Sequence, residues 1–339
     1  MRVITLGEIM LRLAPEGYYR FVQAVSYGAT YGGGEANVAV SLAGFGIDCA
    51  YVTKLPKHEI GQGAVNCLRE FGVDTSLIVR GGGRVGIYFL EKGASQRPSK
   101  VIYDRAHSAI AAADETDFDW DKIFQGASWF HFTGITPALS DSAAAICLAA
   151  CKAARSKGLT VSCDLNYRAN LWTREKAGEV MSRLMEFVDI CIANEEDAAD
   201  VFGIRAAGSN AASGVISSDG YKETAAALIK RFGFRQAAIT LRESISANDN
   251  NWAAMLCTGD DFYFSKKYAV HIVDRVGGGD SFSAGLIYAN LQGMAPQEGL
   301  EFATAASCLK HTIEGDFNVV SVDEVKKLAS GNATGRVQR

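Results

Sequence analysis

Several features that would place this chain in a specialised class are scarce or missing among its 339 residues. Five prolines and no low-complexity tract leave no apparent linker between domains. The eight cysteines include no Cys-x-x-Cys pair and no regular spacing, which is typical of reduced core residues in a cytosolic protein. The longest apolar run, Ala143 to Cys151, is far too short to span a bilayer.

The net charge and the amino-terminal residues indicate which partners and which cell compartment to expect. The formal net charge is −4 and no sustained run of Lys and Arg is present, which argues against a nucleic-acid or anionic-membrane partner. The chain enters a strand-like segment at Val3–Leu6 without the charged and apolar regions of a signal peptide. We therefore expect a cytoplasmic protein that binds any anionic substrate through local arginines.

Common nucleotide-binding motifs are missing or misplaced. There is no Gly-Lys dipeptide, hence no P-loop, and no His-Arg-Asp, hence no protein-kinase catalytic loop. Gly81–Gly86 fits the G-x-G-x-x-G pattern, but it leads into the strand-like Ile87–Leu90 instead of a helix. No helix N-terminus would then meet a pyrophosphate, so a dinucleotide-dependent dehydrogenase is disfavoured.

The hydrophobic pattern indicates an α/β protein. With 48% hydrophobic and 21% charged residues, the chain can bury a large core. Short β-branched or aromatic runs alternate with longer helical patterns, which predicts a mainly parallel sheet covered by helices. The predicted strands are Val3–Leu6, Ala50–Thr53, Ser128–Phe132, Thr160–Cys163, Asp189–Ile192 and Gln236–Leu241, and the predicted helices are Gly61–Phe71, Asp141–Lys157, Arg174–Phe187, Glu195–Phe202, Lys222–Phe232, Ser281–Gln292 and Gln297–His311.

The most informative segment is Val270–Phe282, where a β-like run stops at three glycines and a helical pattern follows. The backbone N–H groups of Gly277–Gly279 can approach a phosphate closely, together with the first N–H groups of the helix. Asp280 could accept a proton from a hydroxyl that attacks a phosphoryl group held there. On these residues alone, a simple helix N-cap after a glycine turn is the plainer interpretation of Asp280.

Two motifs resemble those of one enzyme family. Asp274–Asp280 resembles the C-terminal signature of the ribokinase-like (PfkB-type) carbohydrate kinases, and Gly32–Ala39 resembles their N-terminal one. They occur in the family's order, and the similarity covers nearly the whole chain. Gly134–Leu139, Asp164–Arg168 and Tyr103–Arg105 resemble 2-keto-3-deoxygluconate kinases in particular.

The resemblance implies a ribokinase-like α/β fold with one kinase domain over residues 1–330 and a C-terminal tail at 331–339. Segments 10–31 and 77–106, which contain strand-like runs and no helix between them, would form a small β-sheet lid. Such a lid would exclude water from the sugar site and would provide the face of a homo-oligomer.

The resemblance also implies a reaction, in which ATP phosphorylates 2-keto-3-deoxygluconate at its primary hydroxyl to give the 6-phosphate. Asp280 would be the base, Gly277, Gly278 and Gly279 the anion hole, and Mg²⁺ the ion that neutralises charge. The residues leave open whether a monovalent cation such as K⁺ is required. A kinase for a neutral ketose such as fructose, or for a nucleoside, is the first alternative. A non-catalytic sugar-binding protein is the second, and the intact Asp280 and glycine turn argue against it.

For the sugar, the family's contacts map onto two groups of residues. Gly33, Gly34 and Asn37 resemble the hydroxyl-binding residues of the large sheet, and Tyr88 and Tyr103 would come from the lid. Arg105 and Arg168 would bind the carboxylate, because the planar guanidinium can donate two parallel hydrogen bonds.

For the nucleotide, the chain departs from the wider family. Arg242–Asn248 replaces the usual Gly-rich loop, so Arg242 is expected at a terminal phosphate and Ser244 or Ser246 at the ribose. Adenine contacts would fall near Ser307, His311 and Asn318, although His311 is equally interpretable as an ordinary residue at a helix C-terminus.

The magnesium site is expected at Asn194–Asp197, which matches the family's Asn-x-x-Glu motif with aspartate in the fourth place. Asn194 would lie beside the nucleotide, and Mg²⁺ would keep several waters between itself and the protein. Whether Glu196 or Asp197 orients those waters stays open. An acidic first helical turn favoured by the macrodipole is the plainer interpretation.

Overall fold

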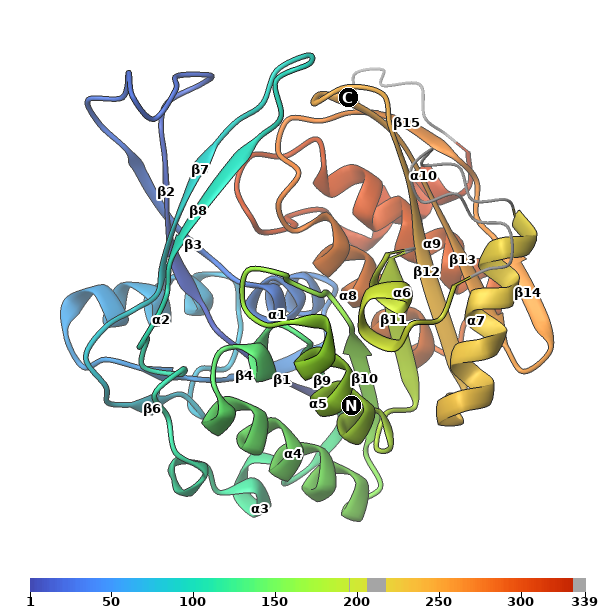
Figure 1. The fold of residues 1–339 in the computed structure, drawn as a ribbon, viewed down its shortest axis with the longest axis horizontal. Helices are drawn as coiled ribbons and strands as arrows, with labels where there is room; N and C mark the ends of the chain where they lie inside the picture. Colours follow the sequence, from blue (N-terminus) through green and yellow to red (C-terminus); the bar gives the residue numbers. More distant parts are fainter. Residues whose placement is uncertain (195, 206–217, 332–339) are drawn as a thin grey trace.

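The computed structural model describes residues 1–194, 196–205 and 218–331 (Figure 1). Its core is a nine-stranded sheet in the order β14-β13-β12-β11-β10-β9-β1-β4, with β15 paired to β13. The strands from β12 to β4 run parallel, whereas β13, β14 and β15 are antiparallel. The strands are β1 (Arg2–Leu6), β4 (Asp48–Val52), β9 (Ala127–Thr133), β10 (Thr160–Asp164), β11 (Ile190–Asn194), β12 (Gln236–Ser244), β13 (Asp249–Thr258), β14 (Asp261–Phe264) and β15 (Tyr268–His271).

Helices cover both faces of this sheet because both faces of its strands are apolar. In β1, Val3 packs into one core cluster and Ile4 into the other, as the two-residue period of a strand requires. The first cluster lies under α1 (Gly34–Gly44), α2 (Glu59–Glu70), α8 (Gly278–Leu291), α9 (Pro296–Lys310) and α10 (Val322–Ala329). The second lies under α3 (Trp120–Ile123), α4 (Asp141–Ser156), α5 (Arg174–Met185), α6 (Asp197–Phe202) and α7 (Ser218–Phe232).

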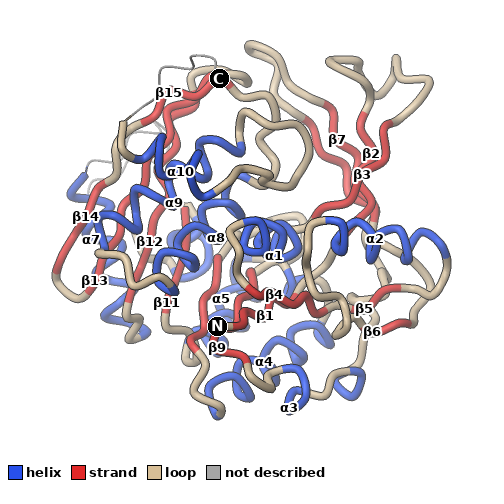
Figure 2. The backbone as a smooth tube through the Cα atoms, turned by 180° about the vertical axis from the view of Figure 1, so that it is seen from behind, coloured by secondary structure: helices blue, strands red, loops and turns tan. Residues whose placement is uncertain are grey.

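A separate four-stranded sheet, in the order β3-β2-β7-β8, stands apart from the main sheet in both views of the backbone (Figures 1 and 2). Its strands come from the two segments that were predicted to lack helices. A short parallel pair, β5 (Lys54–Leu55) with β6 (Val79–Arg80), lies near α2. The strands of the small sheet are β2 (Met10–Ala14), β3 (Gly28–Gly32), β7 (Ile87–Glu91) and β8 (Lys100–Asp104).

The predicted ribokinase-like α/β fold, with its mainly parallel sheet and small second sheet, is confirmed. Several local predictions are wrong. The helix expected from Lys222 already begins at Ser218. The helix expected from Ser281 begins at Gly278, because Gly277 takes up the left-handed conformation (φ 84°) and caps it. Residues 242–244 are strand instead of loop, since β12 continues through Ser244 and pairs with β13.

Other expected features lie partly outside the described residues. Glu195, the expected start of α6, is one of these, and so are residues 332–339 of the expected C-terminal tail. In the described part of the chain, no helix combines the length and the apolarity that crossing a membrane requires.

Candidate active site

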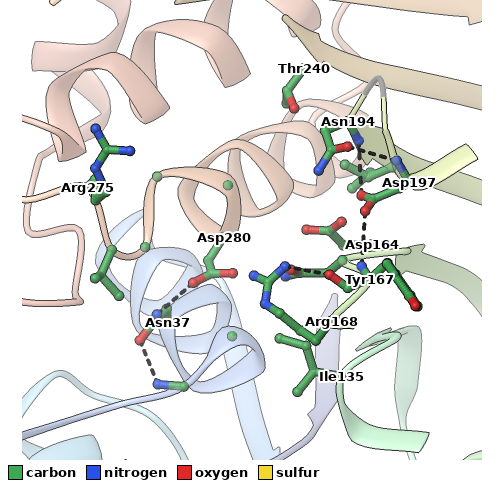
Figure 3. A pocket seen from close by; sticks show the side chains of 18 of the residues that line it. Asn37, Ile135, Asp164, Tyr167, Arg168, Asn194, Asp197, Thr240, Arg275 and Asp280 are labelled. Atoms are coloured by element: carbon green, nitrogen blue, oxygen red, sulfur yellow. Dashed lines mark hydrogen bonds between the residues drawn. The ribbon is translucent and has the colours of Figure 1, made fainter. Parts of the chain in front are cut away.

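A cavity of about 490 Å³ lies where the carboxyl ends of β10 and β11 meet the N-termini of α1 and α8 (Figure 3). Open α/β sheets place ligands at this edge, because chain reversals there leave a crevice between helix N-termini. Tyr88 and Tyr103 of the small sheet also line the cavity. The predicted site residues that line it are Gly33, Gly34, Asn37, Tyr88, Tyr103, Arg168, Asn194, Glu196, Asp197, Arg242, Gly277, Gly278, Gly279 and Asp280.

The glycine turn opens the N-terminus of α8 toward this cavity. A Cβ on Gly277 would lie 2.0 Å from the carbonyl oxygen of Asp316, so only glycine fits there. Ser281 donates its N–H to the Gly277 carbonyl at 2.9 Å, which is the first hydrogen bond of the helix. The N–H groups of residues 278–280 precede that bond, and no group in the described ranges accepts from them. This arrangement provides an anion-binding site.

Asp280 is the third residue of α8 and is 8% exposed. The N-cap interpretation of Asp280 is therefore wrong, because Gly277 holds that position. Oδ2 of Asp280 accepts a hydrogen bond of 2.7 Å from Nδ2 of Asn37. Oδ1 of Asn37 in turn accepts one of 3.2 Å from the Gly33 N–H. Burial raises the pKa of Asp280 to about 7, while the bond from Asn37 opposes the rise. A carboxyl with such a pKa exchanges a proton near neutral pH, as a general base must.

Asp164 and Arg168 point into the same space as Asp280 (Figure 3). Asp164 ends β10, and burial together with the charges of Asp197 and Asp280 raises its pKa well above the ordinary value. Arg168 is the cation that opposes this rise, and its Nη1 donates to the Tyr167 carbonyl at 2.9 Å. Sequence reasoning missed Asp164, although a polar residue at the end of a buried strand was an available signal.

Asn194 and Asp197 shape the loop between β11 and α6. Asn194 Oδ1 accepts from the N–H groups of Glu196 (2.8 Å) and Asp197 (2.9 Å). Asp197 accepts from the N–H groups of Tyr167 (3.1 Å) and Asn194 (3.2 Å), one on each carboxylate oxygen. Burial raises the pKa of Asp197 to about 6. Both its oxygens therefore hold backbone in place, whereas Glu196 is exposed at the cavity rim.

The donor set favours indirect binding of a divalent cation. Within residues 1–194, 196–205 and 218–331, no group of three or more His, Cys, Asp or Glu side chains is arranged to hold a metal directly. Mg²⁺ commonly binds through one or two carboxylates, substrate phosphates and waters. Glu196 at the rim and Asp164 in the wall are oxygen donors that fit this mode.

Two further arginines line the cavity. Arg242 of β12 was predicted there, and Arg275 was not, although it lies inside the C-terminal signature. The pKa of Arg275 is lowered by burial and by the charge of Arg242, so the two guanidinium groups repel each other. An anion bound between them would relieve that repulsion.

Arg105 is not brought to the cavity. Its Nε donates to Oε2 of Glu8 at 2.8 Å, and its Nη2 bonds the same oxygen. The guanidinium is 5.3 Å from the ring centroid of Tyr103, and the Arg105 side chain is 8% exposed. In this conformation the charge of Arg105 is thus committed to Glu8.

Five residues that were predicted to contact the nucleotide, Ser244, Ser246, Ser307, His311 and Asn318, are likewise not part of the cavity lining. Ser307 donates from Oγ to the Gly278 carbonyl at 2.6 Å, and Asn318 donates from Nδ2 to Oγ of Ser281. His311 follows the last residue of α9 and its Nδ1 lies 2.7 Å from the Ser307 carbonyl oxygen, which matches the plainer interpretation of this residue. These three side chains support the glycine turn from behind. Ser244 and Ser246 belong to the β12–β13 hairpin, where Ser246 donates to Asp249 at 2.8 Å.

Comparison with known proteins identifies the family. The family model described as pfkB family carbohydrate kinase matches residues 2–320. The chain belongs to this family. The predicted resemblance is thereby confirmed, and the protein is a carbohydrate kinase.

Three similar proteins show how closely this chain matches kinases of known name. A solved structure of 2-dehydro-3-deoxygluconokinase from Thermotoga maritima is 55% identical, covers 98% of each chain and superposes with a TM-score of 0.94. A 2-dehydro-3-deoxygalactonokinase from Haloferax volcanii is 32% identical over 334 residues, which is 98% of each protein. A putative ribokinase II from E. coli, solved with ATP and Mg²⁺, shares the fold at 19% identity and a TM-score of 0.79, over 97% of this chain and 99% of that one.

Proposed function

We propose that this kinase transfers the γ-phosphoryl group of ATP to the primary hydroxyl of 2-keto-3-deoxygluconate, giving the 6-phosphate and ADP. The observation that carries the proposal is the placement of Asp280, the open N-terminus of α8 and Arg168 around one cavity. A base, an anion hole and a cation for a carboxylate are the groups that phosphorylation of a sugar acid requires. The similarity to the Thermotoga maritima enzyme supports the same substrate class.

The chemistry follows from the contacts of Asp280. The sugar hydroxyl loses its proton to Asp280 as its oxygen forms a bond to the γ-phosphorus, and the bond from that phosphorus to ADP breaks. The N–H groups of Gly278, Gly279 and Asp280 would stabilise the charge on the transferred group. Arg242 and Arg275 would hold the terminal phosphates. Mg²⁺ bound to those phosphates would neutralise further charge, with Glu196 orienting its waters.

Recognition of the sugar acid would depend on Arg168. Its Nη1 donates to the Tyr167 carbonyl, which fixes the guanidinium, and within the described ranges no other group accepts from its side chain, so the remaining N–H groups could bind a carboxylate. The backbone at Gly33 approaches closely because a Cβ there would lie 2.0 Å from the Glu8 carbonyl oxygen. Asn37, Tyr88 and Tyr103 would bind the hydroxyls. Arg105 could join Arg168 only after leaving Glu8.

The small sheet would serve as the lid and as the contact face of a homo-oligomer. Its edge strand β8 is exposed along its whole length, and Val101, Ile102 and Tyr103 are 38%, 44% and 40% exposed. An exposed edge with apolar side chains is a common site of association. Light scattering after size-exclusion chromatography, with Ile102→Lys as the disrupting variant, tests this association.

One coupled assay of ADP release over a panel of sugars tests the substrate. The panel contains 2-keto-3-deoxygluconate, its galactonate epimer, fructose and a nucleoside. The epimer is included because the Haloferax volcanii relative is named for it. We expect the highest kcat/KM for a 2-keto-3-deoxy sugar acid. A preference for fructose or the nucleoside would refute the proposal, and no turnover with any compound would favour a binding protein.

A further inference from the structure

Four charged side chains are buried together beside the glycine turn: Arg12, Asp274, Lys310 and Asp316, of which Asp316 also lines the cavity. Their exposed fractions are 3%, 2%, 0% and 4%. Isolated charges are seldom buried so completely, because the loss of hydration costs several kcal/mol per ion. We call this group the buried charge cluster.

Arg12 joins the two acids of the cluster. Its Nη1 donates to Asp316 at 2.7 Å and its Nη2 to Asp274 at 2.5 Å. The remaining carboxylate oxygens are also occupied. Tyr88 donates its hydroxyl to Asp316, and the N–H groups of residues 276 and 315 donate to Asp274 at 3.1 and 3.2 Å.

Lys310 packs directly against the glycine turn. A Cβ built on Gly277 would lie 3.2 Å from Cε of Lys310, and Nζ donates to the Ile313 carbonyl at 3.2 Å. Burial and the charge of Arg12 lower the pKa of Lys310, whereas the carboxylates of Asp274, Asp316 and Asp280 favour its charged form. In that form, Lys310 places an ammonium group just behind the backbone that would face a phosphate.

In their usual charge states, the four side chains of the cluster carry two positive and two negative charges. A monovalent metal ion placed beside Gly277 would need carboxylate or carbonyl oxygens that are not already neutralised. Asp274 and Asp316 do not meet that condition, because Arg12 bridges them and Lys310 lies beside them. The monovalent cation that the sequence left open therefore does not fit behind this turn.

We propose that Lys310 is a positioning residue that supplies, from within the chain, the positive charge behind the Gly277 turn, so that the kinase needs no added monovalent cation. The inference rests on the proposed function for its kinetic consequences, because it concerns phosphate binding by the same turn. Its structural basis, a balanced cluster packed on Gly277, does not depend on which sugar is phosphorylated.

The experiment measures cation dependence of wild type, Lys310→Ala and Lys310→Met at constant ionic strength, with choline, potassium or ammonium chloride. Wild type should change by less than about twofold among these salts, since its cation is built in. Lys310→Ala should lose at least about tenfold in kcat/KM for ATP and regain part of it in ammonium. Lys310→Met, which fills the space without a charge, should lose activity and regain none. Lys54→Ala, which removes a lysine paired with Asp117 elsewhere, is the control.

A requirement of wild type for potassium would overturn the proposal, and so would wild-type kinetics of Lys310→Met or a failure of ammonium to restore Lys310→Ala. Titration calorimetry with ATP in the same salts keeps the test independent of the sugar. If no sugar is phosphorylated, the proposed function fails while the effect of Lys310 on ATP affinity still decides this inference. Because the titration of wild type compares the three salts directly, it tests the cation requirement even if a Lys310 variant does not fold.

Discussion

The side-chain amide of Asn37 donates a 2.7 Å hydrogen bond to the carboxylate of Asp280, although 243 positions separate the two residues in the chain. The bond joins the first turn of α1 to the first turn of α8, so the two signature motifs meet at one carboxyl group. A hydrogen bond to the charged form of a carboxyl lowers its pKa. Asn37 therefore opposes the rise of the Asp280 pKa on burial and would help to keep this carboxyl available as the proposed base.

Replacement of Asp280 by Asn should lower kcat by roughly 10²- to 10⁴-fold, the usual contribution of a positioned base. The shape of the side chain is preserved, so the KM values for both substrates should change little. Steady-state kinetics measures both quantities. Turnover within about threefold of wild type would show that another group accepts the proton.

The pH dependence should report the same carboxyl. Because Asp280 acts when deprotonated, kcat/KM should rise with pH through about 7 and then level off. Asn37→Leu removes the hydrogen bond that lowers this pKa, so the rising limb should move to higher pH. Rate profiles that coincide for wild type and Asn37→Leu would contradict the assignment.

Thermal unfolding provides an independent check of the Asp280 pKa. Stability should fall as pH rises, whereas an ion-paired carboxylate makes stability rise with pH. The folded protein holds the Asp280 proton more tightly than the unfolded chain, so the stability due to the protonated form is lost as pH rises from about 4 to about 7. Asp280→Asn removes this loss. Its Tm should therefore exceed that of wild type above neutral pH, and the difference should vanish in acid.

The glycine turn should show two separable effects. A Cβ on Gly279 meets no atom within 4 Å, whereas one on Gly278 would lie 2.4 Å from Cε1 of His311. Gly279→Val should therefore fold normally and weaken ATP binding by at least about tenfold, because the side chain enters the space for phosphate. Gly278→Val should lower Tm. Calorimetric titration and thermal unfolding distinguish the two, and unchanged ATP affinity of Gly279→Val would mean that the turn does not bind phosphate.

The two arginines predicted to bind the substrate carboxylate should differ. Arg168→Leu should cost about 2–5 kcal/mol in kcat/KM for 2-keto-3-deoxygluconate, because it leaves a buried carboxylate unpaired, and much less for fructose. Arg105→Leu should instead destabilise the fold by about 3–5 kcal/mol, because it leaves Glu8 buried without its cation.

The Glu8→Gln/Arg105→Leu variant should regain much of that stability, which denaturant unfolding can measure. If Arg105→Leu keeps wild-type stability and loses the preference for the sugar acid, Arg105 leaves Glu8 when substrate binds. If Arg168→Leu keeps the preference, the carboxylate is bound elsewhere.

Much of the site could be predicted because its signals are local. Three consecutive glycines before a helix expose backbone N–H groups whatever surrounds them, and Asp280 follows them directly in the chain. The alternation of strands and helices then places Arg168 at the carboxyl edge of a parallel sheet. Asp164 lay within the same segment and was missed, because a carboxylate at a strand end does not show by itself that two others will lie near it.

Long polar side chains were harder to place, because several partners compete for them. Nothing local in the segment around Arg105 shows that Glu8 will lie beside it. Glu8 lies between β1 and β2, and Arg105 follows β8 at a distance of 97 positions in the chain, so the two side chains meet only in the folded protein. Ser307 and Asn318 likewise have hydroxyl and amide groups suited to a nucleotide. The packing of α9 and of the segment that follows it against α8 places Ser307 at the Gly278 carbonyl and Asn318 at the Ser281 hydroxyl instead.

By itself, the sequence determined the fold class and the glycine turn with its neighbouring carboxylate at the start of a helix, because these depend on hydrophobic period and on backbone geometry within a few residues. Only the tertiary structure decided which charged groups pair with each other. Arg12 is far in the chain from Asp274, Lys310 and Asp316, and the burial of the four side chains together sets their charge balance. Electrostatic energies depend on distance and on exclusion of water, and both are fixed only when the elements pack.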